Sequence, residues 1–191
     1  MKKLLLFSAF IAFAFAANAQ STSYHAFKVD VDFGYAIPGS SSNSGGSSSV
    51  KAGATFTVEP HYRLSDQFAV GLRIEAAALG YASPDGSGGY NSAKVTALGS
   101  YCATAEYYLM DGGFRPFVGA GFGLFTQASV SANNNGNNGT VTSPASTGAG
   151  FFPRIGFETG HLRLSAAYNI VGNNNSYAAF TIGFFLGGGK K

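Results

Sequence analysis

Apolar and polar residues alternate throughout Phe27-Lys28-Val29-Asp30-Val31-Asp32-Phe33-Gly34-Tyr35. Successive side chains of a β-strand point to opposite faces, so this pattern predicts a strand with one apolar face and one charged face. Residues 56–64 and 68–75 repeat the alternation, again with their charges on the polar face. The same criterion predicts eight strands in all, near residues 26–36, 51–64, 68–82, 93–109, 114–127, 149–159, 162–171 and 177–187.

A processing segment precedes the strands. Lys2 and Lys3 give it a positive start, residues 4–16 are apolar, and Ala17-Asn18-Ala19 has the small residues of a cleavage site. We therefore expect a signal peptide over residues 1–19 and a single domain over residues 20–191; an uncleaved anchor helix is the alternative. The formal net charge of +3 includes both lysines and falls to +1 without them, so it indicates no nucleic-acid partner.

The connections between the predicted strands alternate in length. Three are tight turns, at residues 65–67, 110–113 and 160–161. Four are longer polar linkers, at residues 37–50, 83–92, 131–148 and 172–176. Short turns at one end and long loops at the other are typical of outer-membrane barrels, whose short turns face the periplasm. We predict an all-β fold: an eight-stranded antiparallel up-and-down transmembrane β-barrel with both termini on the periplasmic side.

The charges decide which face of the strands points inward. A soluble lipocalin-like barrel is the rival interpretation, with its apolar face inside. Acidic and basic residues nearly balance on the polar face, and a narrow polar lumen has to pair them because an isolated buried charge is very costly. We therefore predict a structural charge network inside the barrel, made of Lys28, Asp30, Asp32, Glu59, His61, Arg63, Arg73, Glu75, Glu106, Arg154, Glu158 and Arg163.

The predicted lumen is small. The interior of an eight-stranded barrel is just wide enough for side chains to fill. Tyr108, Phe117, Phe152 and Phe185 also fall on the inward face. The glycines that make room for them there are Gly71, Gly119, Gly121, Gly156 and Gly183. We expect a plugged interior; the alternative is a narrow conduit for small or hydrophobic solutes.

Signals of catalysis or ligand binding are sparse. A hydrolase, such as a lipid-A-modifying enzyme, needs a nucleophile, a histidine and a carboxylate together, yet only His61 is a mid-strand histidine and no catalytic motif is present. The histidines and Cys102 lack metal-ligand spacing. The glycine-rich residues 119–123 precede no helix, so they do not form a phosphate-binding loop. We expect no enzymatic activity, no metal and no cofactor.

Three further segments carry a family resemblance. They are Arg115-Pro116-Phe117-Val118-Gly119-Ala120-Gly121-Phe122-Gly123, Pro153-Arg154-Ile155-Gly156-Phe157-Glu158 and Phe180-Thr181-Ile182-Gly183-Phe184-Phe185-Leu186. In this order after a signal peptide, they resemble the small outer-membrane β-barrel domain of Gram-negative Bacteroidetes, related in architecture to barrels of the outer-membrane-protein-A and -W types. The resemblance covers about residues 26–191.

The resemblance implies a place and partners for the chain. It implies residence in the cell outer membrane among lipid and lipopolysaccharide, as a monomeric, porin-like barrel, and mostly no defined activity. Many such barrels end on an aromatic residue that the barrel assembly machinery recognises, whereas a Gly-Lys tail ends this chain at residues 187–191. The recognition signal is then expected inside the last strand, within residues 180–186.

Overall fold

The computed structural model describes residues 23–39, 50–84, 90–133, 139–172 and 176–191. The expected signal peptide at residues 1–19 lies outside the described residues, as does a part of each of the four expected long linkers. No helix in the described part is long and apolar enough to cross a membrane. The elements are β1 (Phe27–Pro38), β2 (Val50–Arg63), β3 (Phe68–Pro84), β4 (Tyr90–Tyr108), β5 (Phe114–Asn133), β6 (Gly139–Thr159), β7 (Leu162–Val171) and β8 (Tyr177–Gly187).

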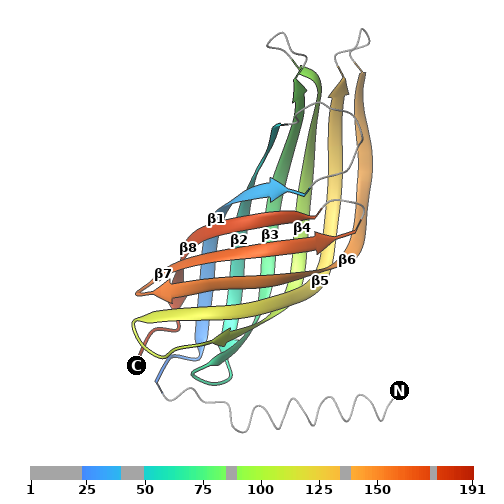
Figure 1. Ribbon diagram of the computed structural model, residues 1–191. Coiled ribbons are helices and arrows are strands. Elements are labelled where there is room, and N and C mark those ends of the chain that lie inside the picture. The colour runs from blue at the N-terminus through green and yellow to red at the C-terminus, as the bar shows by residue number, and fades with distance from the viewer. Residues whose placement is uncertain (1–22, 40–49, 85–89, 134–138, 173–175) are drawn as a thin grey trace, which may run out of the picture.

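The eight strands form one closed sheet. Each strand pairs in antiparallel fashion with the next, and β1 also pairs with β8, so that the sheet closes into a barrel (Figure 1). The predicted eight-stranded antiparallel up-and-down β-barrel is confirmed. Closure pairs the backbone on both sides of every strand within the barrel, which is the condition for a sheet to cross lipid.

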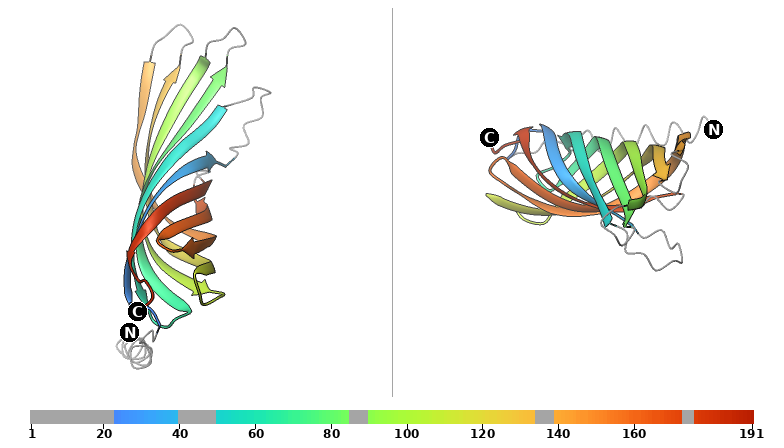
Figure 2. Two further views of the ribbon diagram at one scale, coloured as in Figure 1. Left: turned by 90° about the vertical axis from the view of Figure 1, so that its left-hand side faces the viewer. Right: turned by 90° about the horizontal axis from the view of Figure 1, so that it is seen from above.

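The strands differ in length, and the barrel is closed only at the end that carries the tight turns. β7 has 10 residues and β6 has 21. β6 pairs with β5 from Gly139 onward, but with β7 only from Gly150 onward. Figures 1 and 2 show β2 to β6 continuing past the ends of β1, β7 and β8 as a curved wall. The opposite end of the barrel is therefore open on one side.

The expected loop over residues 131–148 was wrong in its extent. Strand β5 continues to Asn133 and β6 begins at Gly139, and a register shift between Gln127 and Ser129 interrupts their pairing. The small polar residues of this stretch were interpreted as a loop. Once β5 and β6 are paired, however, their backbones continue the ladder, because strand preference depends more on pairing context than on composition. The other strand ends agree with the prediction within three residues.

The three tight turns lie where they were predicted. They join β2 to β3, β4 to β5 and β6 to β7. Gly160 has a φ of +58°, which glycine adopts without strain in the two-residue connection to β7. Tyr24 forms an isolated antiparallel bridge with Lys190. The two ends of the described chain therefore meet at the turn end.

Large apolar side chains cover the outside of the closed part. Phe33, Phe122, Ile155 and Ile182 are between 55% and 62% exposed. An apolar surface of this extent is unusual on a soluble monomer and matches the lipid-facing band of a membrane barrel. From Phe27 to Tyr35, β1 advances eight residues. At about 3.3 Å per residue and a tilt of about 40°, that distance is roughly 20 Å along the barrel axis, close to the band that such barrels present.

We call this band of exposed apolar side chains the apolar belt. It predicts that an outward-facing charge destabilises the barrel more at the centre of the belt than beyond its edge. Ile182 lies between Phe180 and Phe184 on β8, whereas Val130 lies outward on the open wall. We expect Ile182→Arg to lower the free energy of unfolding in bilayers by about 2–4 kcal/mol and Val130→Arg by about 0–1 kcal/mol. Urea titration in lipid vesicles measures both. Equal costs at the two positions would contradict the placement of the belt.

Candidate functional site in the barrel interior

The inward side chains of β1 and β2 supply half of the predicted network. Lys28, Asp30 and Asp32 alternate along β1, and the inward residues of β2 include Glu59 and His61. The register places Asp30 directly opposite Glu59. Carboxylates that face each other across two strands repel, so compensating cations have to come from elsewhere in the barrel.

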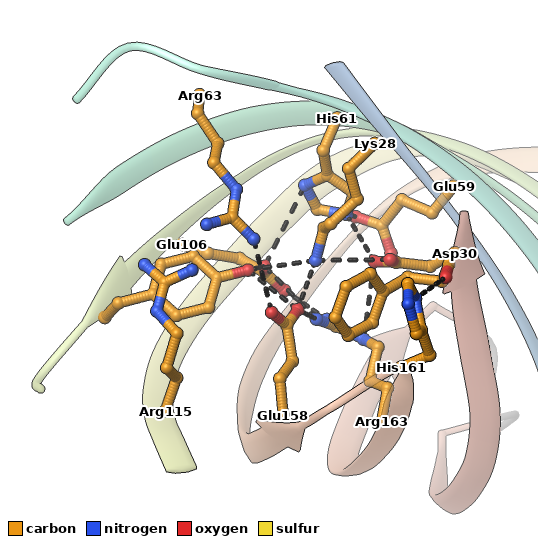
Figure 3. Close-up of polar contacts among 12 residues, drawn as sticks. Lys28, Asp30, Glu59, His61, Arg63, Glu106, Arg115, Glu158, His161 and Arg163 are labelled. Atoms are coloured by element: carbon orange, nitrogen blue, oxygen red, sulfur yellow. Dashed lines mark hydrogen bonds and ion pairs between the residues drawn. The ribbon is translucent and has the colours of Figure 1, made fainter. Parts of the chain in front are cut away.

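Those cations come from β6 and β7, and Figure 3 shows the one from β7, Arg163, within the cluster. Arg154 donates to both carboxylate oxygens of Glu59, at 2.6 and 2.9 Å. Arg163 Nε lies 3.4 Å from Asp30 Oδ2. The Arg154–Glu59 pair therefore connects opposite walls, because β6 and β2 lie four strands apart, whereas the Arg163–Asp30 pair joins β7 to β1 past β8. This geometry exists only once the sheet has closed.

Glu106 and Glu158 occupy the centre of the cluster. Glu106 Oε1 is bound by Arg163 and lies 2.6 Å from Arg154 Nη2. Glu158 Oε1 is bound by Lys28 and lies 2.7 Å from Arg163 Nη1. Each carboxylate thus bridges two cations, and such charge-assisted contacts are stronger than neutral hydrogen bonds.

A second, smaller group lies toward the open wall. Arg73 donates to Glu75, and the Tyr177 hydroxyl donates to the same carboxylate. The Arg73 guanidinium also stacks over Phe152, with its Cζ 4.1 Å from the ring centroid. Among the described residues, no ion pair joins this group to the main cluster.

The structure buries all of the predicted network. The side chains named from the sequence are between 0% and 5% exposed. It places ten of them in or beside the main cluster and sets Arg73 and Glu75 apart. The inward aromatic residues are buried with them, and a Cβ added at Gly156 would lie 2.6 Å from Phe117 Cζ. The inward glycines therefore make room for large side chains.

Arg115 was not among the residues predicted from the sequence. It is 4% exposed and lies two residues before Phe117, on the same inward face of β5. The inward assignment of Phe117 was the signal that indicated it. With Arg115 included and His61 left out of the count, the buried lysine and arginine side chains of the described residues equal the buried carboxylates: six cations (Lys28, Arg63, Arg73, Arg115, Arg154 and Arg163) accompany six carboxylates (Asp30, Asp32, Glu59, Glu75, Glu106 and Glu158).

One group within the cluster has the spacing of a metal site. Ligand atoms of Glu59, His61 and Glu106 lie within 4.8 Å of one another. Arg154 already holds oxygens of both carboxylates, at 2.6 Å in each case. A metal ion would have to displace a guanidinium that is bound on two sides, so the arrangement fits ion pairing better than metal binding.

The fold matches solved barrels, whereas the sequence matches no known family. No family model and no curated protein matches the chain. Ail, the attachment invasion locus protein of Yersinia pestis, has a similar structure in its complex with the heparin analogue sucrose octasulfate, with a TM-score of 0.52, 10% identity and coverage of 84% of this chain and 99% of Ail. A second Ail structure gives 0.50, 8%, 83% and 98%. The outer membrane protein OprG from Pseudomonas aeruginosa gives 0.48, 14%, 87% and 97%.

The Arg73–Glu75 pair offers a test of charge pairing in the interior. Arg73→Met leaves Glu75 buried without its cation, so we expect a loss of about 3–5 kcal/mol in the free energy of unfolding. Removing both charges in Arg73→Met/Glu75→Gln should cost less than the sum of the two single changes. Urea unfolding of the four proteins completes the cycle. Additive losses would show that the two side chains do not stabilise each other.

Proposed function

We propose that this chain is a non-enzymatic integral protein of the outer membrane, a structural or surface-exposed barrel of the small Bacteroidetes type. Its interior is plugged by its own side chains. The observation that carries the proposal is the cross-lumen cluster, in which Arg154 and Arg163 join β6 and β7 to the carboxylates of β1, β2 and β4. A water-filled channel would leave such charges hydrated instead of stacked and paired.

The free space in the interior also supports a plug. Between the two charged groups, a cavity of about 10 Å³ is bounded by residues that include Asp32, Thr57 and Arg73. That volume holds about one water molecule. A solute passing along the barrel would have to break the Arg154 and Arg163 bridges, which favours a structural or surface-exposed role over transport. A narrow conduit for small or hydrophobic solutes is the second candidate.

The outer surface supports a place in the outer membrane. The apolar belt fits lipid, and a closed eight-stranded antiparallel barrel is an architecture that spans outer membranes. In this setting, lipid and lipopolysaccharide contact the belt, the assembly machinery engages β8 and the chain is a monomer. A signal peptide directs it there.

The interior chemistry argues against a lipid-modifying enzyme. His61 Nε2 lies 3.1 Å from both Asp30 Oδ2 and Glu59 Oε1 and is 1% exposed. A nucleophile would have to be a hydroxyl such as that of Thr104, which donates a hydrogen bond to Glu59 at 2.6 Å. Both groups face the lumen, away from the lipid in which such a substrate lies.

The open wall of this barrel does not favour binding of the heparin analogue that is bound in the Ail structure. Recognition of a sulfated sugar needs clustered cations. In the described part of the open wall, the cations are Lys51 and Lys94, on β2 and β4. We therefore do not extend binding of a heparin analogue to this chain.

Conductance distinguishes the plug from the conduit. In planar bilayers, the purified barrel should give no steady unitary current, because the cluster closes the lumen. The variant Arg154→Ala/Arg163→Ala removes both cross-lumen bridges and should be less stable. Discrete, reproducible current steps from the unmodified protein would contradict a plugged interior and support the narrow conduit.

Gel migration and fractionation test the membrane placement. A closed barrel resists detergent until it is boiled, so heated and unheated samples should migrate differently on a denaturing gel. The protein should also fractionate with outer membranes. Recovery as a soluble periplasmic protein with one migration position would reject the proposal.

A further inference from the structure

A cavity lies at the turn end of the barrel, beyond the centre of the charge cluster. It has a volume of about 510 Å³. Its walls include the last residue of β2, the start of β5, the end of β6 and the paired chain ends. The side chains that matter for its chemistry are Tyr24, Arg63, Arg115, Glu158, His161 and Lys190.

Two arginines share two aromatic rings beside this cavity. The Arg115 Cζ lies 3.9 Å from the ring centroid of Tyr24 and 4.1 Å from that of Tyr108. The Arg63 Cζ lies 4.9 and 5.1 Å from the same centroids. Figure 3 shows Arg63 and Arg115 together at one edge of the cluster. Cation–π contacts hold the guanidinium groups in place but leave their N–H donors available.

Both arginines keep buried donors without an acceptor. Arg63 is 1% exposed and Arg115 is 4% exposed, yet Nε and Nη1 of each have no hydrogen-bond partner among the described residues. Arg115 Nη2 donates to the backbone oxygen of Asp66. Arg63 Nη2 has a long contact of 3.4 Å to Glu158 Oε2. Buried donors are almost always satisfied in native proteins, so four unsatisfied ones at one cavity indicate a missing acceptor.

The charges around the cavity also indicate that a negatively charged acceptor is missing. Glu158 is the carboxylate that lines it in the described part of the chain. That carboxylate already binds Lys28 and Arg163. Lys28 and Arg163 therefore already compensate its single negative charge, so Glu158 does not neutralise Arg63 and Arg115 as well. Lys190 adds a further positive charge at the rim of the cavity.

We propose that this cavity binds a small oxyanion, a phosphate or carboxylate group, through Nε and Nη1 of Arg63 and Arg115. The fork of guanidinium donors matches the oxygens of such groups. The cavity volume leaves room for the molecule that carries the anion, as in ordinary small-ligand sites. Only the compartment that supplies the ligand rests on the proposed function, because an outer-membrane barrel turns this end toward the periplasm.

The paired chain ends build the wall of this site. His25 N donates to Gly189 O at 2.9 Å, which continues the bridge between Tyr24 and Lys190. Gly112 N donates to the Tyr24 hydroxyl at 3.2 Å, which ties the ring to the turn between β4 and β5. Tyr24 is therefore a positioning residue for the two guanidinium groups.

Titration with inorganic phosphate tests the proposal directly. The folded protein in detergent micelles, labelled with ¹⁵N-arginine, is titrated at constant ionic strength with chloride as the balancing ion. We expect saturable shifts of the Nε–H signals of Arg63 and Arg115. Arg73, which binds Glu75 in the second group, should not shift and serves as the internal control. A parallel titration with acetate distinguishes a carboxylate ligand from a phosphate ligand.

Three variants complete the test. Arg115→Gln should abolish saturation at Arg63, and Lys190→Gln, which changes an exposed rim residue, should raise the Kd about two- to fivefold without affecting folding. Lys94→Gln, at the opposite end of the barrel, should leave the Kd unchanged. Saturation by either anion with this pattern supports the site. Shifts that grow linearly with both anions, or that are equal at Arg73, would overturn it.

Discussion

The rest of the structure depends on the need to pair charges in a lumen too narrow for bulk water. Asp30 and Glu59 face each other across β1 and β2 and cannot neutralise each other. Their cations come from non-adjacent strands: Arg154 of β6 reaches Glu59 from the opposite wall, and Arg163 of β7 reaches Asp30 past β8. Desolvation of each group is costly, and only a closed barrel provides the compensating contacts. The charges thus favour closure in one register, because a one-residue shift would turn them toward lipid.

The need to pair buried charges also explains why charged and apolar inward residues lie at different levels along the barrel. Charges and large inward aromatics fill the closed end, where β1, β7 and β8 complete the ring. An apolar layer follows within the closed part, where Leu79, Leu98 and Phe125 pack with Ala36, Val171 and Tyr177 of β1, β7 and β8. Beyond this layer, the one-sided wall has no opposite surface from which a partner charge could reach. The position of the charge cluster therefore coincides with the part of the barrel that has a complete circumference.

Much of this architecture was predictable from local sequence. The alternation around Asp30 and Glu59 predicted both the strands and the inward face, since period two is a local property. Arg115 was missed although its parity with Phe117 indicated it. The continuation of β6 from Gly139 depends on pairing with β5, and composition alone suggested a loop. The separation of Arg73 from the main cluster depends on the stagger between distant strands, which no local pattern reports.

The central claim, that a paired and water-excluding charge cluster closes the barrel, is tested most directly by proton exchange at its centre. NMR of the folded protein can measure the exchange of the Arg163 Nε–H with solvent, with the backbone amide of Gly113, an exposed residue of the turn between β4 and β5, as the reference. The account predicts exchange at Arg163 that is slower than at the reference by orders of magnitude. Exchange as fast as at the exposed reference would show that water reaches the cluster and would contradict the account.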